Sequence, residues 1–375
     1  MSSSPPDALH VAVDCRVVSP HYPGIGRATL ETVRALIARD DAPFLSLVVA
    51  SRPSDALLDL IGDRVRLYSL ASSPRSPLDQ WALPRLLHEI KPAVYHAAYY
   101  AVPAFLPGRV VVNIFDVIPR LFPAYWPNPV SRGVIDAWLA LAARRATLIL
   151  TPSESTAHDV ARLWPGAKSK VRTASLGVAP RLASTAAEAG DRPYLLYVGS
   201  NKPHKNLTRL VEAFGSIAST THGDLVIAGA WDARYPQPLD RARRLGLGGR
   251  VRFIHRPSDE QLDALYAGAT GFVFPSRYEG FGLPVLEAMA AGLPVATTTG
   301  GSLAEVAGDA ALLFSPDDEA AIARALNALL TDDALRRRLT KAGLARAAEA
   351  TWARTAEQVL AVYREAAALP IGKAR

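Results

Sequence analysis

The stretch FVFPSRYEGFGLPVLEAMAAGLPV spans residues 272–295 and reads as a strand, a glycine-bearing loop, a short helix, a turn and a second strand. Pro284 suits the first helical position, where its missing N–H costs nothing. The free amides of the first turn are therefore expected beside the loop Gly280, Phe281, Gly282 and Leu283. Because such amides and the positive end of the helix dipole attract anions, the stretch predicts a diphosphate site.

Two glutamates flank this amide cluster, Glu279 before the loop and Glu287 in the first turns of the helix. Their carboxylates can accept hydrogen bonds from the hydroxyl groups of a sugar and a ribose. Glu287 has apolar neighbours, so its helix is expected to be buried, and a buried carboxylate without a partner is costly. A structural salt bridge or a cap at a sheet edge would also satisfy these groups, so the spacing alone leaves both interpretations open.

Outward from this stretch, short β-rich runs alternate with longer helical patterns, which predicts an α/β fold of two Rossmann-like domains with parallel sheets. The expected strands cover residues 10–18, 44–50, 65–68, 94–96, 110–115, 147–151, 194–198, 225–228, 251–254, 271–275, 295–299 and 311–314. The expected helices cover residues 27–38, 80–88, 130–146, 155–163, 207–218, 238–245, 259–267, 284–291 and 319–330.

The length of 375 residues exceeds the ~250–300 residues at which one core stops growing, so two domains are expected. A polar, alanine-rich stretch at residues 182–193 marks the boundary, with a first domain at 1–188 and a second at 189–354. The final segment, 334–368, is strongly helical and no strand follows it. We expect it to pack across the domain junction, with a helix of about residues 355–375 on the first domain.

The net charge is +7, and residues 1–190 carry most of it, with 20 Lys and Arg against 15 Asp and Glu (+5). This excess fits an anionic membrane surface, an anionic substrate or a solvated exterior. Nucleic-acid binding is not expected, since the basic residues are scattered and no zinc-finger or helix-turn-helix pattern occurs. A single cysteine, Cys15, no signal peptide and no apolar run of ~18 residues predict a cytoplasmic protein.

The string at 272–295 resembles the donor-binding signature of glycosyltransferase family 4, with its Glu-x7-Glu motif, and the resemblance covers nearly the whole chain. The family has the GT-B fold, in which two parallel sheets face each other across an interdomain cleft, and its members are retaining enzymes. The resemblance implies that Glu279 contacts the transferred sugar and that Glu287 holds the ribose. It also implies that the backbone of Phe281, Gly282 and Leu283 contacts sugar hydroxyls and phosphate.

Two further segments resemble the family. The run from Asp14 to Arg27 is similar to its first strand and glycine loop, whose Gly24 and Gly26 would let the backbone approach the donor phosphates beside Arg27; a bare Gly-x-Gly is more often a tight turn. The run 194–206 resembles the loop whose basic residues neutralise the leaving diphosphate. Lys205 occupies the family's lysine position. Many members carry an arginine where this chain has Ser200, which makes Lys202 the candidate for the second positive charge.

The turn after residue 252 resembles the segment that frames the nucleobase, mainly through backbone atoms. His255 and Arg256 in this turn could stack on a base or simply be exposed turn residues. The run 299–313 resembles a stretch that is typical of the mannosyltransferases of the family. This favours GDP-mannose as the donor, with a UDP-hexose as the alternative.

The chain departs from the family on the strand at 110–119, which in many relatives ends in His-Asp. Phe115 replaces the histidine and cannot donate a hydrogen bond, so Asp116 becomes the nearest polar candidate. His96 is a second candidate, since the carboxyl ends of parallel strands face the ligand crevice, although a core histidine is an equal alternative. Tyr99 and Tyr100 could line an acceptor site or pack under a loop.

Aromatic residues around Phe122–Trp126 and Trp138 mix with arginines in the first domain. Such amphipathic stretches can contact the inner face of an anionic membrane, but a helix packed on its sheet has the same pattern. The arginines concerned are Arg120, Arg132, Arg144 and Arg145.

The predicted activity is transfer of a hexose from a nucleotide-sugar to a hydroxyl acceptor, such as a lipid-linked sugar or a growing polysaccharide. Glu279, Lys205, Asp116 and His96 are the catalytic candidates. No Asp-x-Asp occurs, so no metal ion and no cofactor are expected. A non-catalytic sugar-nucleotide-binding protein is the alternative, because Phe115 and Ser200 are both losses. An epimerase or phosphorylase would need acid/base or cofactor machinery that the sequence does not show.

Overall fold

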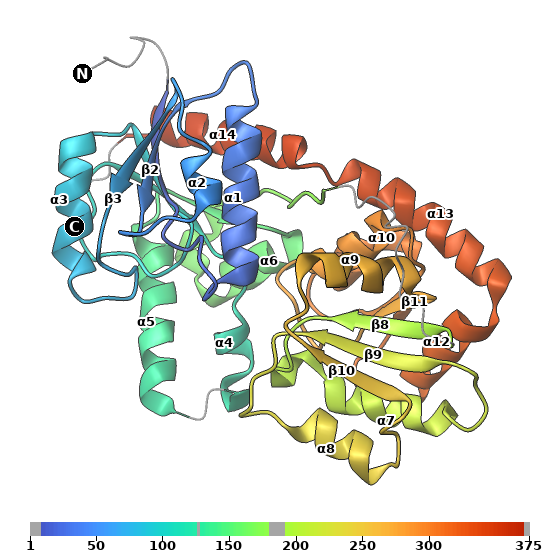
Figure 1. The fold of residues 1–375 in the computed structure, drawn as a ribbon. Coiled ribbons are helices and arrows are strands. Elements are labelled where there is room, and N and C mark those ends of the chain that lie inside the picture. The colour runs from blue at the N-terminus through green and yellow to red at the C-terminus, as the bar shows by residue number, and fades with distance from the viewer. Residues whose placement is uncertain (1–8, 126–127, 180–191, 371–375) are drawn as a thin grey trace. The chain divides into compact units, whose positions relative to one another are not determined.

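The computed structural model describes residues 9–125, 128–179 and 192–370, which form two α/β units (Figure 1). The first unit contains the chain up to Gly177 and from Trp352 onward, and the second contains Val178–Thr351. The expected boundary between residues 188 and 189, Trp126 and the expected helical residues 371–375 lie outside the described residues. Each unit holds one parallel sheet, which confirms the predicted α/β class.

The first unit has a seven-stranded sheet in the order β3-β2-β1-β4-β5-β6-β7, and every pair of neighbours is parallel. In register, Val11 of β1 lies opposite Leu45 of β2 on one side and Val94 of β4 on the other. The strands are β1 (His10–Asp14), β2 (Phe44–Val49), β3 (Val65–Ser69), β4 (Val94–Ala97), β5 (Arg109–Asn113), β6 (Leu148–Thr151) and β7 (Val171–Thr173).

Several helices of this unit begin where the sequence offers a proline or a capping side chain. Pro23 opens the first helix, and the Asn128 side chain accepts the amide of Val130 at 2.9 Å at the start of another. The helices are α1 (Pro23–Ile37), α2 (Asp55–Leu58), α3 (Asp79–Ile90), α4 (Ile118–Leu121), α5 (Pro129–Arg145), α6 (Glu154–Leu163) and α14 (Trp352–Ala368), with 3-10 turns η1 (Pro123–Tyr125) and η2 (Pro165–Lys170).

The sheet of the first unit is buried on both faces, as its continuous apolar strands require. On β1, Val11 and Val13 face one cluster of buried side chains, to which α1 contributes Leu36 and α14 contributes Val359. Ala12 faces the opposite cluster, which α3, α5 and α6 complete. Figure 1 shows α14, in red, beside α1, in blue, so the end of the chain supplies part of the core of the first unit.

The second unit has a six-stranded parallel sheet in the order β10-β9-β8-β11-β12-β13. Figure 1 shows α7 and α8 on one face of this sheet and α9 and α10 on the other. The strands are β8 (Tyr194–Val198), β9 (Asp224–Gly229), β10 (Val251–His255), β11 (Gly271–Phe274), β12 (Val295–Thr298) and β13 (Ala311–Phe314). The helices are α7 (Leu207–Ile217), α8 (Gln237–Arg244), α9 (Asp259–Gly268), α10 (Leu283–Ala290), α11 (Leu303–Ala307), α12 (Glu319–Thr331) and α13 (Asp333–Glu349), with 3-10 turns η3 (Pro203–Lys205) and η4 (Gly308–Ala310).

The segment expected as a glycine loop is helical, which corrects the sequence prediction. Because Pro23 occupies the start of α1, Gly24 and Gly26 lie in its first turns rather than before it. A Cβ on Gly26 would come within 2.6 Å of the carbonyl oxygen of Val17, so glycine is required there for close packing. Open space surrounds the corresponding position on Gly24.

The helical end of the chain divides into two helices, α13 and α14, which a break at Ala350 and Thr351 separates. The two helices belong to different units, α13 to the second and α14 to the first. The short elements β7, α2, α4 and α11 were not anticipated, since three to five residues are too few for a clear period.

His96 lies in the core of the first unit, which corrects its assignment as a catalytic candidate. Its side chain on β4 is 3% exposed, and both ring nitrogens have protein partners. Nδ1 accepts from the Tyr363 hydroxyl at 2.6 Å, and Nε2 donates to Oδ1 of Asn113 at 3.0 Å. Burial lowers the pKa of His96 to about 4, so the ring is neutral at pH 7. The histidine therefore joins α14 to the sheet.

We predict that Tyr363→Phe lowers the free energy of unfolding by about 1–2 kcal/mol, because a buried acceptor on His96 loses its donor. Urea unfolding followed by circular dichroism measures the change. Tyr68→Phe is the matched control, since no hydrogen bond of the Tyr68 hydroxyl is recorded within the described part of the chain. Equal stability of the two variants would contradict the structural role of the His96–Tyr363 bond.

Candidate functional site

The strand order of the second unit reverses between β8 and β11, and the loops that leave these two strands define the candidate site. In open parallel sheets, the reversal opens a crevice at the carboxyl edge of the strands. The loop after β8 ends in η3 with Lys205, and the loop after β11 carries Glu279. The topology therefore brings together two residues that lie 74 positions apart in the chain.

Lys205 and Glu279 form an ion pair, with the ammonium nitrogen 2.6 Å from Oε1 of the carboxylate. The side chains are only 15% and 11% exposed, so solvent screens the pair weakly. The ammonium also lies 5.3 Å from the centre of the Phe274 ring at the end of β11. A cation and a carboxylate are thus held in place before any ligand binds.

The carboxylate of Glu279 is ionised at neutral pH despite its burial. Burial alone would raise its pKa, but the adjacent positive charge and hydrogen bond of Lys205 outweigh this effect and hold the pKa below its usual value. The neighbouring His204 has a pKa of about 4 and is neutral at pH 7, so Lys205 is the cation that matters there. Glu279 can therefore accept hydrogen bonds at physiological pH.

We predict that Lys205→Met lowers the free energy of unfolding by about 3 kcal/mol, because it leaves the Glu279 carboxylate buried without its cation. Adding Glu279→Gln should recover part of this loss. Urea unfolding measures both, and Arg243→Met is the control, since the Arg243–Asp240 pair is 71% and 49% exposed and worth less than about 1 kcal/mol. A double variant no more stable than Lys205→Met would refute the coupling.

Ser302 holds the loop between Glu279 and α10 through hydrogen bonds. The Ser302 hydroxyl lies 3.0 Å from the carbonyl oxygen of Glu279 and 2.6 Å from that of Phe281, and its single proton is shared between these two acceptors. Gly282 takes a φ of 107°, which favours glycine, and a Cβ there would lie 2.6 Å from the Leu303 side chain. The Ser302 hydroxyl and the backbone conformation of Gly282 therefore shape the entrance to α10 together.

Glu287, on α10, is 5% exposed and accepts a hydrogen bond from the Tyr266 hydroxyl at 3.3 Å. This tyrosine, from α9, is itself 1% exposed. Both glutamates of the motif are thus buried and each has a protein partner. A lone buried tyrosine gives no sequence signal for such a pairing, and for that reason Tyr266 was not predicted.

His204 is buried between the two loops of the site, and its backbone carbonyl accepts the amide of Arg277 at 2.7 Å. Burial, together with the positive charge of Lys205, lowers its pKa to about 4 from 6.5. The unfolded chain therefore binds this proton at a higher pH than the folded chain does. The stabilising contribution of the neutral ring is complete above pH 6.5 and is lost as the pH falls from 6.5 towards 4.

We predict that the wild-type protein loses stability between pH 7 and pH 5, with about 2 kcal/mol from each of His204 and His96. His204→Gln should reduce this pH dependence by about half. Urea titrations at the two pH values, with exposed His255→Gln as the control, measure the effect. A pH dependence unchanged in His204→Gln would contradict the lowered pKa.

A cavity of about 330 Å³ opens at the carboxyl ends of β8, β9 and β10. Its wall is largely apolar, and Trp231 and Phe253 meet in it edge to face with ring centres 5.4 Å apart. His255 lines the cavity, and its Nδ1 accepts the amide of Trp231 at 3.1 Å. Asn201, buried at the rim, holds the same loop by donating to the carbonyl of Asp232 at 2.9 Å.

The remaining residues expected near the donor surround these loops. Arg256 is exposed at a φ of 48°, and its amide donates to the carbonyl of Gly229 at 2.9 Å. The carbonyl of Ser200 accepts the hydroxyl of buried Tyr197 at 2.8 Å. Lys202 is exposed. The pKa of the Asp232 carboxyl is lowered mainly by its hydrogen bond with Arg234, while burial acts in the opposite direction. The positive charge of Lys202 adds to the lowering.

In the first unit, Arg27 is exposed on α1 and Asp116 lies half-buried after β5. The carboxylate of Asp116 accepts the amide of Ile118, the first residue of α4, at 3.0 Å. Phe115, in the position where a histidine was expected, lines a small cavity of about 20 Å³ together with Thr355 of α14.

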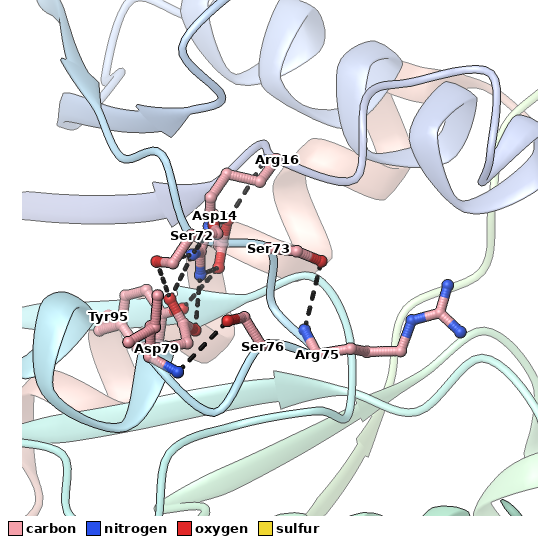
Figure 2. Close-up of polar contacts among 9 residues, drawn as sticks. Asp14, Arg16, Ser72, Ser73, Arg75, Ser76, Asp79 and Tyr95 are labelled. Carbon is pink, nitrogen blue, oxygen red and sulfur yellow. Dashed lines mark hydrogen bonds and ion pairs between the residues drawn. The ribbon is translucent and has the colours of Figure 1, made fainter.

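A buried ionic network at the end of β1 was not predicted (Figure 2). Arg16, 5% exposed, donates to Asp14 at 2.8 and 2.6 Å and to Asp79 at 2.5 and 3.1 Å. It also donates to the carbonyl of Ser72 at 2.8 Å, and the Tyr95 hydroxyl donates to Asp14 at 2.9 Å. The network ties the loop between β3 and α3 to the exit of β1. The strand expected over residues 10–18 placed Arg16 inside a strand. Because β1 ends at Asp14, Arg16 lies after the strand instead.

Two parallel-sheet Rossmann-like units define the GT-B class of glycosyltransferases. The solved structure of WaaG, a glycosyltransferase involved in lipopolysaccharide biosynthesis, superposes with a TM-score of 0.70 at 19% identity and covers 93% of this chain and 98% of its own. Sucrose-phosphate synthase from Thermosynechococcus elongatus gives a TM-score of 0.73 at 21% identity, over 95% and 98% of the two chains. These similarities confirm the predicted fold.

The chain belongs to glycosyltransferase family 4. Residues 22–182 match the family described as Glycosyltransferase Family 4, and residues 181–346 match the family described as Glycosyl transferases group 1. O-antigen chain mannosyltransferase B of Escherichia coli is 31% identical over 376 residues, which cover 92% of this chain and 97% of that protein. Serotype-specific mannosyltransferase WbdA of Escherichia coli is 29% identical over 379 residues, 89% of this chain but 45% of its own length. The predicted enzyme class, glycosyltransferase, is thereby confirmed.

Across the described ranges, no helix combines the length and the apolar character that a membrane span needs. Within the same residues, no three side chains among His, Cys, Asp and Glu are grouped so that they could hold a metal ion.

Proposed function

We propose that this enzyme transfers mannose from GDP-mannose to a hydroxyl group of a growing polysaccharide or lipid-linked sugar, with retention at the anomeric carbon and without a metal ion or other cofactor. The observation that carries the proposal is the buried Lys205–Glu279 pair at the strand-order reversal of the second unit. It places a cation for a diphosphate beside a carboxylate for sugar hydroxyls. The names of the most similar relatives support mannose as the transferred sugar.

In this proposal, the bond between the anomeric carbon and the phosphate oxygen breaks while the acceptor oxygen bonds to the same face of that carbon. The acceptor proton passes to the departing phosphate oxygen, and the nucleoside diphosphate leaves. Lys205, Lys202 and the backbone at the start of α10, from Gly280 to Leu283, stabilise the negative charge that develops on the phosphate. The backbone of Ser200 belongs to the loop after β8, which also carries Lys202 and Lys205.

The two glutamates have different tasks in this proposal. Glu279, ionised beside Lys205, accepts hydrogen bonds from the hydroxyls of the transferred sugar and positions its anomeric carbon. Glu287, on α10, accepts the ribose hydroxyls. The nucleobase occupies the cavity that His255 lines, with Arg256 at its edge. In the first unit, Arg27 and Asp116 are the side chains proposed to contact the donor.

A UDP-hexose is the second donor candidate, and one observation favours it. A structural neighbour, HepE of Anabaena, is described in complex with UDP and glucose, and it superposes with a TM-score of 0.74 at 16% identity over 95% of this chain and 100% of its own. Calorimetric titration of the protein with GDP-mannose, GDP, UDP-glucose and UDP separates the two candidates. Tighter binding of UDP-glucose than of GDP-mannose would overturn the choice of donor.

Retention is tested by proton NMR of the product, because the coupling at the anomeric carbon distinguishes the two configurations. A product with the inverted configuration would exclude front-face attack. Assays in EDTA test the metal-free proposal, and restoration of a lost activity by Mg²⁺ would contradict it. Tight donor binding without acceptor-dependent release of GDP would support a non-catalytic protein.

We predict that Glu279→Gln lowers kcat by about 100-fold and changes the Kd of GDP-mannose less than threefold, because its contacts act on the transferred sugar. Glu287→Gln should instead raise the Kd at least tenfold through the lost ribose contact. Steady-state kinetics and calorimetry measure both. Glu305→Gln is the control, since this carboxylate lies on α11, outside the proposed donor contacts. Wild-type activity in both variants would refute the assignment.

A further inference from the structure

The strand order of the first unit also reverses, between β1 and β4. By the same rule that identifies the donor loops in the second unit, the loops after β1 and β4 border a ligand crevice. These loops carry Tyr22, just before α1, and the consecutive Tyr99 and Tyr100. An aromatic cluster thus occupies the position that corresponds to Lys205 and Glu279 in the other unit.

The three tyrosines belong to one small cluster, and Tyr100 also packs against a cluster on one face of the sheet. The rings of Tyr22 and Tyr99 meet at a 61° angle with centres 5.3 Å apart, and those of Tyr99 and Tyr100 are tilted by 31° with centres 4.2 Å apart. Trp138 of α5 packs against the same group. Tyr22 is half-buried, so part of its ring is accessible to a ligand.

An arginine lies at the edge of this cluster. Arg75 donates through Nε to the hydroxyl of Tyr22 at 2.8 Å, and its guanidinium carbon is 5.1 Å from the centre of that ring. Its two terminal nitrogens have no recorded partner among the described residues, and the side chain is exposed. Four N–H groups are therefore available to a ligand.

The Arg16 network holds the loop that carries Arg75. Ser72 and Asp79, on either side of Arg75 in the chain, both bind the buried guanidinium of Arg16. In Figure 2, the Arg75 side chain extends away from this network. The loop is thus anchored at both ends while its arginine remains outside, which is an arrangement that preorganises a binding group.

The chemistry of this group matches a sugar ring. The flat rings fit the apolar C–H faces of a pyranose, and the terminal N–H groups of Arg75 can donate to the hydroxyl oxygens on its rim.

We propose that Tyr22, Tyr99 and Arg75 form a binding platform for a sugar ring of the acceptor. The proposal rests on the transferase function proposed above and specifies which substrate the first unit recognises. The apolar face of the pyranose ring lies on Tyr22, and its rim hydroxyls bind the terminal nitrogens of Arg75. The acceptor is therefore a saccharide, and a lipid or protein portion attached to it is not required for recognition.

Kinetics with a water-soluble mannobiose as the acceptor and GDP-mannose as the donor test this proposal. Tyr22→Leu keeps the apolar volume but removes the flat ring and should raise the KM for mannobiose about tenfold, with the Kd of GDP-mannose unchanged. Arg75→Ala should raise the same KM to a similar extent. Tyr22→Phe retains the ring, frees Arg75 from its hydrogen bond and should give an intermediate KM.

Matched controls come from the neighbouring helix. Trp81→Leu and Arg85→Ala replace an aromatic residue and an arginine of α3 that are exposed and outside the cluster, so both should retain the wild-type KM for mannobiose. Circular dichroism of each variant confirms folding. A wild-type KM in folded Arg75→Ala and Tyr22→Leu, or a KM raised equally by the controls, would overturn the platform.

Saturation-transfer NMR with mannobiose alone separates this proposal from the donor assignment. Signals that are present with the wild type and lost in Tyr22→Leu support the platform even if GDP-mannose is not the donor. Loss of donor binding in Tyr22→Leu, with the mannobiose signals retained, would show that the cluster serves the donor and would overturn the proposal. Absence of signals with the wild-type protein would overturn it as well.

Discussion

The reversal of strand order in each parallel sheet is the constraint on which the rest of this structure depends. From β1 the sheet is extended towards one edge, and from β4 towards the other; β8 and β11 divide the second sheet in the same way. The crossover connections that follow the two strands of each pair therefore diverge, so none of them covers the loops between these strands. In the second unit, an ion pair between Lys205 and Glu279 joins these loops. In the first unit, the contact between Tyr22 and Tyr99 joins them. The same reversal of strand order thus produces two chemically different sites, an ionic site in the second unit and an aromatic site in the first.

Both places depend on buried charges whose partners are part of the fold. Arg16 is bound by Asp14 and Asp79, and Lys205 by Glu279, so the cost of desolvating each ion is offset before any substrate arrives. Charges that are already desolvated and oriented need little reorganisation during a reaction, which is the condition for electrostatic stabilisation of a transition state. The same pairing explains why removing one partner should cost more stability than removing both.

The last helix accounts for the environment of His96. This side chain uses both ring nitrogens on Tyr363 of α14 and Asn113 of β5, so it joins α14 to the sheet. Phe115, in place of a histidine, borders a small cavity together with Thr355 of α14.

The sequence by itself determined the α/β class, nearly all strands and long helices, the family and the strand–loop–helix unit at 272–295, because these follow from local periodicity, from proline and glycine positions and from contiguous motifs. Only the tertiary structure decided which distant residues meet. The pairing of Lys205 with Glu279, of Glu287 with Tyr266 and of His96 with Tyr363 joins positions 74, 21 and 267 residues apart. Such pairings arise from strand order and helix packing, and no local pattern encodes them.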